Sequence, residues 1–218
     1  MKGFFSYDSK LTLILNIIAD VVLVNILYLL CCLPVVTLGA ARAALYTAGC
    51  KWFRKEESGV KNFLKAFANN LRESTPITLC FLVVALLFCY CTFLVYVNDV
   101  PGRMGFYITL TVALVVLAMI LSQVFMCVSR FSCTFLQYIQ NALILGFYMS
   151  VRSVCHVALF LLPWVLLFCL PDIFFNAIPF WLLVYFSGQG YLNAAMVCGV
   201  YDELAAEHQS RSSGTEVI

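Results

Sequence analysis

The chain has 218 residues, of which 63% are hydrophobic and only 11% are charged. A soluble domain carries about 25% charged residues, so this chain has too little polar surface to cover an exterior that faces water. The net charge of +2 is too small to indicate a nucleic-acid partner. The composition predicts an all-α, polytopic transmembrane helix bundle whose solvent is the lipid bilayer.

Six stretches of the chain are candidates for crossing the membrane. A hydrocarbon core about 30 Å thick needs roughly 20 apolar residues in a helix. Five apolar runs meet or approach that length, and a sixth, 35–53, is apolar except for Arg42 and Lys51. In chain order the five runs are 11–33, 76–97, 105–128, 153–170 and 177–200.

The basic residues between these runs predict the orientation of the chain. The N-terminus and the segments 51–75 and 129–152 carry most of the lysine and arginine, so we expect them on the cytoplasmic side. The short segments 98–103 and 171–176 hold a single basic residue between them, Arg103, and are expected to face outward.

The stretch "CCLPVVTLGAARAALY" (31–46) decides the number of crossings. If Lys10 and Lys51 both lie in the cytoplasm, an even number of crossings separates them, which predicts a helical hairpin that turns near Pro34. Proline disfavours helix in the preceding residue and is tolerated in a first helical turn. The hairpin gives six crossings with both termini cytoplasmic. If 35–53 is instead a re-entrant or interfacial helix, five crossings remain and the N-terminus lies outside.

Small residues are concentrated at the start of the expected return helix. Gly39, Ala40, Ala43 and Ala44 form pairs at four-residue spacing, and such pairs let transmembrane helices approach each other closely. We expect this ridge to pack 35–53 against a neighbouring helix of the chain. The alternative is a homo-oligomer interface.

Asp20 and Arg42 are the ionisable residues well inside the first two runs, and an intramembrane charge is by default a candidate for function. In a straight hairpin they differ in depth by about 9 Å, which disfavours a direct pair. We expect Asp20 to join Asn16 and Asn25 in a polar stripe, and Arg42 to extend outward to the interface. Direct pairing remains the alternative.

Residues 60–73 show the pattern of a basic amphipathic helix. Their apolar side chains recur at three- and four-residue steps, and Lys61, Lys65 and Arg72 occupy the other face. We expect this helix to lie at the cytoplasmic surface and to meet a partner or anionic lipid. Residues 134–153 predict a second interfacial helix at the corresponding place. The apolar side chains of the first helix are Val60, Phe63, Leu64, Phe67 and Leu71.

The last apolar run contains "SGQGYLNAAM", in which Gln189 and Asn193 lie one turn apart. This polar face predicts hydrogen bonds to a neighbouring helix or, alternatively, a polar path for a solute. We expect residues 1–205 to form a single transmembrane domain and residues 206–218 to form a polar, disordered cytoplasmic tail. His156, near the start of the fifth run, has no titratable partner at its depth, and we expect it to be structural.

The sequence contains no motif that indicates an enzyme or a metal site. HExxH, GxSxG, a P-loop and paired intramembrane aspartates are absent, and the eleven cysteines form neither a CxxC pair nor a zinc-ligand pattern. We therefore expect no catalytic residue, no cofactor and no metal, and interpret the cysteines as small apolar residues at helix contacts.

Several stretches together resemble the YesL-like family of bacterial membrane proteins. The most specific is "NILYLLCCLPVVTLGAARAALY" (25–46), and three further segments follow in the family's order. The resemblance covers about residues 1–205, and the chain departs from the family in its cysteine-rich spans and its unusually apolar 134–151. The further segments are "GVKNFLKAFANNLRESTP" (59–76), "SRFSCTFLQYIQNALILG" (129–146) and "YLNAAMVCGVYDELAAE" (191–207).

The resemblance implies a multi-pass protein of the bacterial plasma membrane from a family of unknown function whose members accompany carbohydrate-utilisation genes. It therefore implies an accessory or transport-related role in carbohydrate uptake, with a sugar ABC importer permease or ATPase subunit as a candidate partner. The alternative is a membrane scaffold or regulator without a ligand of its own. A stand-alone solute carrier would need a richer polar lining than Asp20, Gln123, Gln189 and Asn193 provide.

Overall fold

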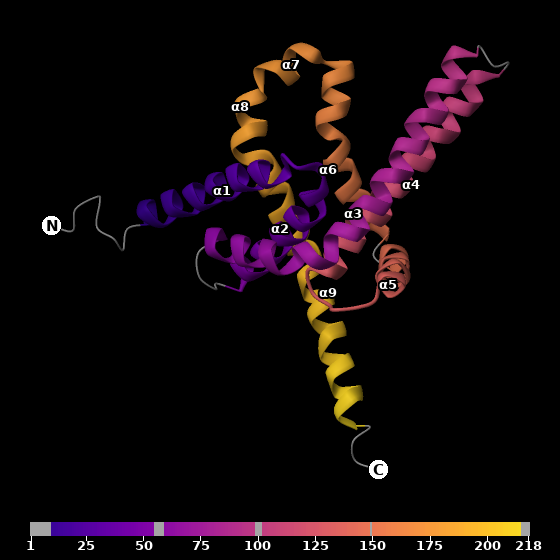
Figure 1. Cartoon of the computed structure of the whole chain (residues 1–218). Coiled ribbons are helices and arrows are strands. Elements are labelled where there is room, and N and C mark those ends of the chain that lie inside the picture. The colour runs from indigo at the N-terminus through magenta and orange to yellow at the C-terminus, as the bar shows by residue number, and fades with distance from the viewer. Residues whose placement is uncertain (1–9, 55–58, 99–101, 149, 215–218) are drawn as a thin grey trace.

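The computed structural model describes residues 10–54, 59–98, 102–148 and 150–214, and within these ranges the chain is helical with no strand. The apolar side chains fill the space between the helices and cover much of their outer surface. In chain order the elements are α1 (Lys10–Cys32), the 3-10 turn η1 (Val35–Thr37), α2 (Leu38–Phe53), α3 (Gly59–Val97), α4 (Arg103–Val128), α5 (Phe135–Tyr148), α6 (Ser150–Cys169), α7 (Pro171–Asn176), α8 (Ile178–Phe180), the π-helical turn η2 (Trp181–Tyr185) and α9 (Phe186–Gly214) (Figure 1).

Among the described residues, three helices are long and apolar enough to cross a membrane. They are α1, α3 and α4, and they contain the predicted runs 76–97 and 105–128 and nearly all of 11–33. A fourth crossing results if 135–148 and 151–163, which are bent by 101°, act as one broken span. The predicted class of a membrane-spanning helical protein is confirmed, and the count of six crossings stays a prediction.

The predicted break near Pro34 is present. Helix α1 ends at Cys32, and the turn η1 leads into α2. The hydroxyl of Thr37 lies 2.6 Å from the carbonyl oxygen of Cys31, at the end of α1, and 2.7 Å from that of Pro34, in the turn, so it is positioned to bond to either. The side chain of one threonine thus fixes the turn between the first two helices.

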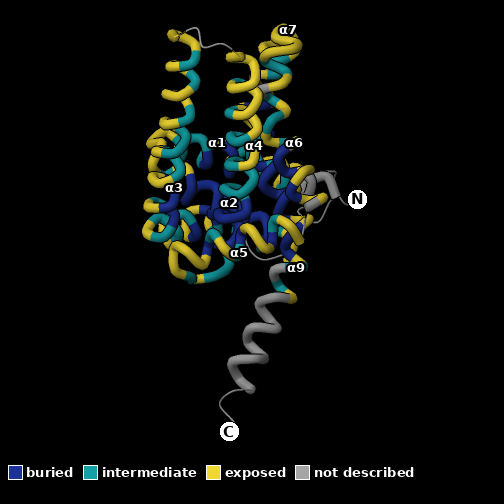
Figure 2. The backbone as a smooth tube through the Cα atoms, turned by 90° about the vertical axis from the view of Figure 1, so that its right-hand side faces the viewer, coloured by how far each residue is buried: buried dark blue, intermediate teal, exposed yellow. Residues whose placement is uncertain are grey.

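Helix α2 lies at the centre of the bundle. It contacts α1, α3, α4 and α9, and Figure 2 shows its backbone as the buried middle of the molecule. From Gly39 to Cys50 every residue except Thr47 is buried. The 16 residues of α2 span about 24 Å. Over most of its length α2 is therefore surrounded by protein. Its small residues and Arg42 face neighbouring helices and not lipid.

The predicted interfacial helix 60–73 and the predicted span 76–97 form one helix, α3, of 39 residues. We expected two elements because the basic amphipathic pattern of 60–73 differs from the apolar run that follows it, and Pro76 at the boundary lacks an N–H. The hydroxyl of Thr75 donates to the carbonyl of Leu71 at 2.6 Å, and α3 continues through Pro76 but bends where its first part meets the span (Figure 1). A partner or lipid surface that holds residues 60–73 would thus act directly on the spanning part of the same helix.

The predicted run 177–200 is interrupted by the π-helical turn η2. At this turn the side-chain amide of Asn25, on α1, forms hydrogen bonds with backbone groups of η2 and α9. Its Nδ2 donates to the carbonyl of Leu182 at 2.6 Å, and its Oδ1 accepts from the N–H of Ser187 at 2.7 Å. The hydroxyl of Ser187 donates in turn to the carbonyl of Val21 at 2.9 Å. Helix α1 therefore completes the hydrogen bonding at the junction of η2 and α9.

The predicted disordered tail is helical in the described part of the chain. Helix α9 continues to Gly214 and extends away from the bundle (Figure 1), and residues 215–218 lie outside the described residues. The sequence "DELAAEHQSR" (202–211) is rich in residues with high helix propensity, which explains why the helix does not end at 205.

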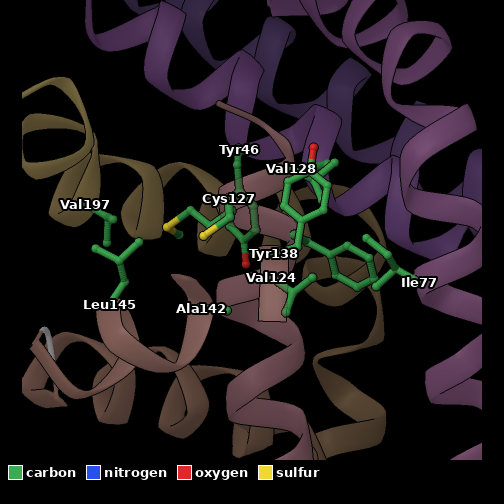
Figure 3. Packing of buried hydrophobic residues seen from close by; sticks show 12 residues of the cluster. Tyr46, Ile77, Val124, Cys127, Val128, Tyr138, Ala142, Leu145 and Val197 are labelled. Atoms are coloured by element: carbon green, nitrogen blue, oxygen red, sulfur yellow. The ribbon is translucent and has the colours of Figure 1, made fainter. Parts of the chain in front are cut away.

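The main apolar cluster joins five helices at the base of the spans. Figure 3 shows Tyr46 of α2, Ile77 of α3, Val124 of α4, Tyr138 of α5 and Val197 of α9 in this cluster. The far ends of α3 and α4 are largely exposed (Figure 2), as expected for surfaces that face lipid. The helices thus pack together around α2, whereas the far ends of α3 and α4 have few buried residues.

One carboxylate connects three segments at the C-terminal end of α2. Asp202 on α9 forms an ion pair with Arg54, which follows α2, and its Oδ1 lies 3.2 Å from Arg130 Nη2, which follows α4. The hydrogen bond from Arg54 to Asp202 raises the pKa of Arg54 above its usual value. Both pairs are partly exposed, and exposed ion pairs contribute about 1 kcal/mol or less.

We therefore expect Asp202→Asn to lower the free energy of unfolding by about 1 kcal/mol or less. Thermal unfolding of the purified protein measures the change, with Glu203→Gln as the control because Glu203 is the exposed acidic neighbour. A loss several times larger would contradict this assignment and would indicate a dominant structural role for the ion pairs.

Candidate functional site

A cluster of buried polar side chains lies around α2. It consists of Arg42 and Tyr46 on α2, His156 on α6, and Gln189 and Asn193 on α9, and we call these five residues the polar cluster. Arginine is almost never fully buried unless it is paired, yet Arg42 is only 7% exposed. Polar groups buried inside a membrane protein mark candidates for function.

Hydrogen bonds connect the polar cluster across three helices. Nη1 and Nη2 of Arg42 each lie 3.3 Å from Gln189 Oε1, and Nε lies 3.2 Å from the hydroxyl of Tyr46. That hydroxyl lies 3.2 Å from Nε2 of His156. Asn193 lies one turn beyond Gln189 on α9 and beside the imidazole. Arg42 is thus bound to α9 directly and to α6 through Tyr46.

The surroundings of the Arg42 guanidinium are neutral. Its central carbon lies 5.6 Å from the ring centroid of Tyr46 and 5.8 Å from that of Phe160, both within cation–π distance. The phenol of Tyr28, on α1, lies beside it as well. Among the side chains that the structure describes, no carboxylate forms an ion pair with Arg42. Its charge is stabilised by dipoles and ring faces.

Three nitrogen atoms of the polar cluster have no hydrogen-bond partner. They are Nδ1 of His156, Nε2 of Gln189 and Nδ2 of Asn193, and their side chains are all buried. Buried polar groups in folded proteins are usually hydrogen-bonded, so each unpaired group calls for an explanation. Each of these three atoms can therefore form a further hydrogen bond.

A cavity of about 320 Å³ adjoins the polar cluster, which places it in the range of about 300–1,000 Å³ typical of ligand sites. Tyr28, Arg42 and His156 contribute polar groups to its wall. The rest of the wall is almost entirely apolar and comes from η1, α2, α3, α4 and α6. The positive charge of Arg42 therefore lies at one side of a largely apolar cavity.

Residues 21–92 match the family described as "Protein of unknown function, DUF624". We call residues 21–92 the DUF624 segment, after the family whose description they match. This is the YesL-like family, so the expected resemblance is confirmed for this part of the chain, about a third of its length. No curated protein and no solved structure matches the chain. The DUF624 segment supplies Tyr28, Arg42 and Tyr46, whereas His156 and Gln189 come from the remainder of the chain.

The small residues of the DUF624 segment lie where α2 meets its neighbours. A Cβ atom added to Gly39 would be 2.1 Å from Thr78 Oγ1 on α3 and 2.3 Å from Cε1 of Phe125 on α4. Ala40, Ala43 and Ala44 are also completely buried. The ridge packs within the chain, so a second copy of the protein has no access to it.

The expectation that Arg42 extends outward to the interface is wrong. It rested on a hairpin whose second helix faces lipid, whereas α2 lies inside the bundle and Arg42 turns toward α9. Asp20 is partly exposed and lies close enough to Tyr191 to affect it electrostatically. The expected stripe with Asn16 and Asn25 does not form, because Asn16 is exposed and Asn25 is bound to α9.

The basic residues of the first half of α3 are accessible. Lys61, Lys65 and Arg72 are exposed, while Phe63 on the opposite face is completely buried. Leu64, which we expected on the buried face, is 46% exposed and lies beside the lysines. The accessible face therefore combines positive charge with an apolar side chain.

Gln189 and Asn193 are both buried, and Gln189 bonds to a neighbouring helix, one of the two roles that the sequence predicted. Tyr28, Tyr46 and His156 were not recognised as parts of a site. One local signal was available for Tyr46, which follows Arg42 by four residues and so shares its face. No described group of three or more His, Cys, Asp or Glu side chains could hold a metal ion.

Proposed function

We propose that this membrane protein is a non-enzymatic accessory component of carbohydrate uptake in the bacterial plasma membrane, with both termini in the cytoplasm. In this proposal residues 59–73 of α3 dock a permease or ATPase subunit of a sugar ABC importer. The link to carbohydrate uptake comes from the resemblance to the YesL-like family. The docking role is supported by the accessible basic face formed by Lys61, Lys65 and Arg72.

The shape of α3 favours a docking role. One side of residues 59–73 is anchored in the bundle by Phe63 and Ala66, so the lysines are presented from a fixed helix. The exposed Leu64 adds an apolar contact between them. Since these residues continue into the spanning part of α3, binding of a partner would be transmitted to the helix that lines the cavity beside Arg42.

The second candidate function is a membrane scaffold or regulator in which the same face rests on anionic lipid. The basic amphipathic pattern favours it, because each Lys or Arg near an anionic membrane surface contributes about 1 kcal/mol of attraction. Such binding weakens with salt, whereas a packed protein interface retains much of its affinity.

Charge reversal tests the docking role. We expect Lys61→Glu combined with Lys65→Glu to abolish the recovery of an importer permease or ATPase subunit after crosslinking in native membranes. Arg152→Glu is the matched control, because Arg152 is an exposed basic residue on another helix. Mass spectrometry of the crosslinked material is the measurement.

If the double variant recovers the same importer subunits as the unmodified protein, the docking role is wrong. If neither protein recovers an importer subunit, and protection of residues 59–73 from hydrogen exchange in anionic vesicles disappears in high salt, the scaffold function replaces it. Protection that persists in high salt, again without an importer subunit, contradicts both functions.

A further inference from the structure

We propose that the cavity beside Arg42 binds an anionic amphiphile, with a carboxylate or phosphate head on the guanidinium and a hydrocarbon chain in the apolar part of the cavity. This site lies inside the bundle and involves none of the exposed lysines of α3. The proposal is therefore independent of the docking role proposed above.

The state of Arg42 indicates an anionic head group. A charge that is removed from water is costly unless it is paired, and this applies inside a membrane-spanning bundle as well. The groups around Arg42, which are Tyr28, Tyr46 and Gln189, are neutral, and the contacts to Gln189 measure 3.3 Å, longer than the usual 2.9–3.0 Å. A carboxylate or phosphate would supply the missing charge and the planar, two-pronged geometry that guanidinium prefers.

His156 is a second indication of a ligand. Its side chain lines the same cavity and is 4% exposed; Asn193 lies beside the ring, and Nδ1 has no partner in hydrogen-bond geometry. Its Nε2 is engaged by Tyr46, which in turn contacts Arg42. In the tautomer that carries hydrogen on Nδ1, the ring offers a donor to an oxygen atom of the ligand head.

The apolar wall indicates the rest of the ligand. Away from Arg42 the cavity is lined by side chains such as Phe81, Leu114 and Leu117, which offer no hydrogen bonds. A sugar would leave its hydroxyl groups unpaired against this wall, and a cation would be repelled by Arg42. A hydrocarbon chain that carries one anionic group matches both parts of the cavity.

The cavity reaches the surface of the bundle. Val35, Leu38 and Phe160 line it and are also exposed. Val35 and Leu38 follow the turn at Pro34, where Leu33 and Val36 are also exposed, and Phe160 on α6 lies beside Arg42. In a bilayer this opening faces acyl chains, so a lipid-like ligand can enter sideways from the membrane.

The binding of dodecyl phosphate tests the proposal. The protein is placed in nanodiscs of zwitterionic lipid, and saturable binding of the radiolabelled probe is compared with that of dodecanol, dodecyltrimethylammonium and inorganic phosphate. We expect dodecyl phosphate to bind most tightly. Arg42→Gln is expected to weaken its binding about 10- to 100-fold, since hydrogen bonds to charged groups contribute about 1.5–3 kcal/mol. Arg152→Gln, on the exposed surface, is the control and should leave binding unchanged.

A second variant tests the apolar part without altering the charge. Ala118 lines the cavity from α4, and Ala118→Phe would fill the space meant for the chain. We expect this variant to lose dodecyl phosphate binding while its thermal unfolding midpoint stays close to that of the unmodified protein. If Arg42→Gln does not fold, two measurements still decide the outcome. They are the relative binding of the four probes to the unmodified protein and the binding of dodecyl phosphate to Ala118→Phe.

The source of the ligand is assigned by competition. If dioleoyl phosphatidic acid in the nanodisc displaces dodecyl phosphate, the site takes an acidic phospholipid of the bilayer, and if it does not, the site takes a single-chain acid. The proposal is overturned if dodecanol binds as tightly as dodecyl phosphate, if Arg42→Gln binds the probe normally, or if Ala118→Phe has no effect.

Discussion

Replacing Gly39 with alanine is expected to destabilise the bundle by about 3 kcal/mol or more, toward the upper end of the cost of overpacking a core. The added Cβ would lie 2.1 Å from Thr78 Oγ1 and 2.3 Å from a ring carbon of Phe125, far inside contact distance. Relief would require the buried side chains of Thr78 and Phe125 to leave their positions or α2 to move away from α3 and α4. We expect a large fall in the thermal unfolding midpoint of the purified protein.

Gly105→Ala is the matched control for this experiment. Gly105 lies within α4, and a Cβ atom added there meets nothing within 4 Å. The control should match or slightly exceed the stability of the unmodified protein, because alanine has the higher helix propensity. If Gly39→Ala unfolds at the same temperature as the control, the close approach of α2 to α3 and α4 is refuted.

Replacing Asn25 with leucine is the substitution with the second largest expected effect. It would leave the carbonyl of Leu182 and the N–H of Ser187 without their side-chain partner. Each buried unsatisfied group costs about 1–3 kcal/mol, so we expect the two together to cost at least about 2 kcal/mol. Hydrogen exchange should rise at the junction of η2 and α9, and the unfolding midpoint should fall.

Asn16→Leu serves as the control for Asn25→Leu, because Asn16 is an exposed asparagine on the same helix. It removes an equal amide and should change neither the exchange near Ser187 nor the unfolding midpoint by much. The opposite result, with Asn25→Leu behaving like Asn16→Leu, would show that the junction does not depend on α1.

Local features of the chain were predictable from the sequence. The apolar runs at 11–33 and 105–128 correspond closely to α1 and α4, and the break near Pro34 follows from proline's effect on its neighbour. The amphipathic period of 60–73 correctly places Phe63 in the core and Lys61 outside. These features depend on residues near one another in the chain, where periodicity and propensity apply.

The surroundings of α2 were not predictable in the same way. Hydropathy measures whether a residue avoids water, and it does not distinguish a helix enclosed by lipid from one enclosed by protein. Arg42 was therefore assigned to the interface, although it binds Gln189, a residue 147 positions later. The same limit applies to Asn25, whose two partners lie in the last quarter of the chain.

The amide of Asn25 has a consequence for how the protein is assembled. Helix α1 is made first, and its Asn25 side chain lacks its partners in η2 and α9 until residues 182–187 have been synthesised. During that interval a polar amide must be carried within an otherwise apolar helix. The docking of α9 onto α1 therefore closes the bundle, and the central helix with Arg42 becomes enclosed only when the final third of the chain has been inserted.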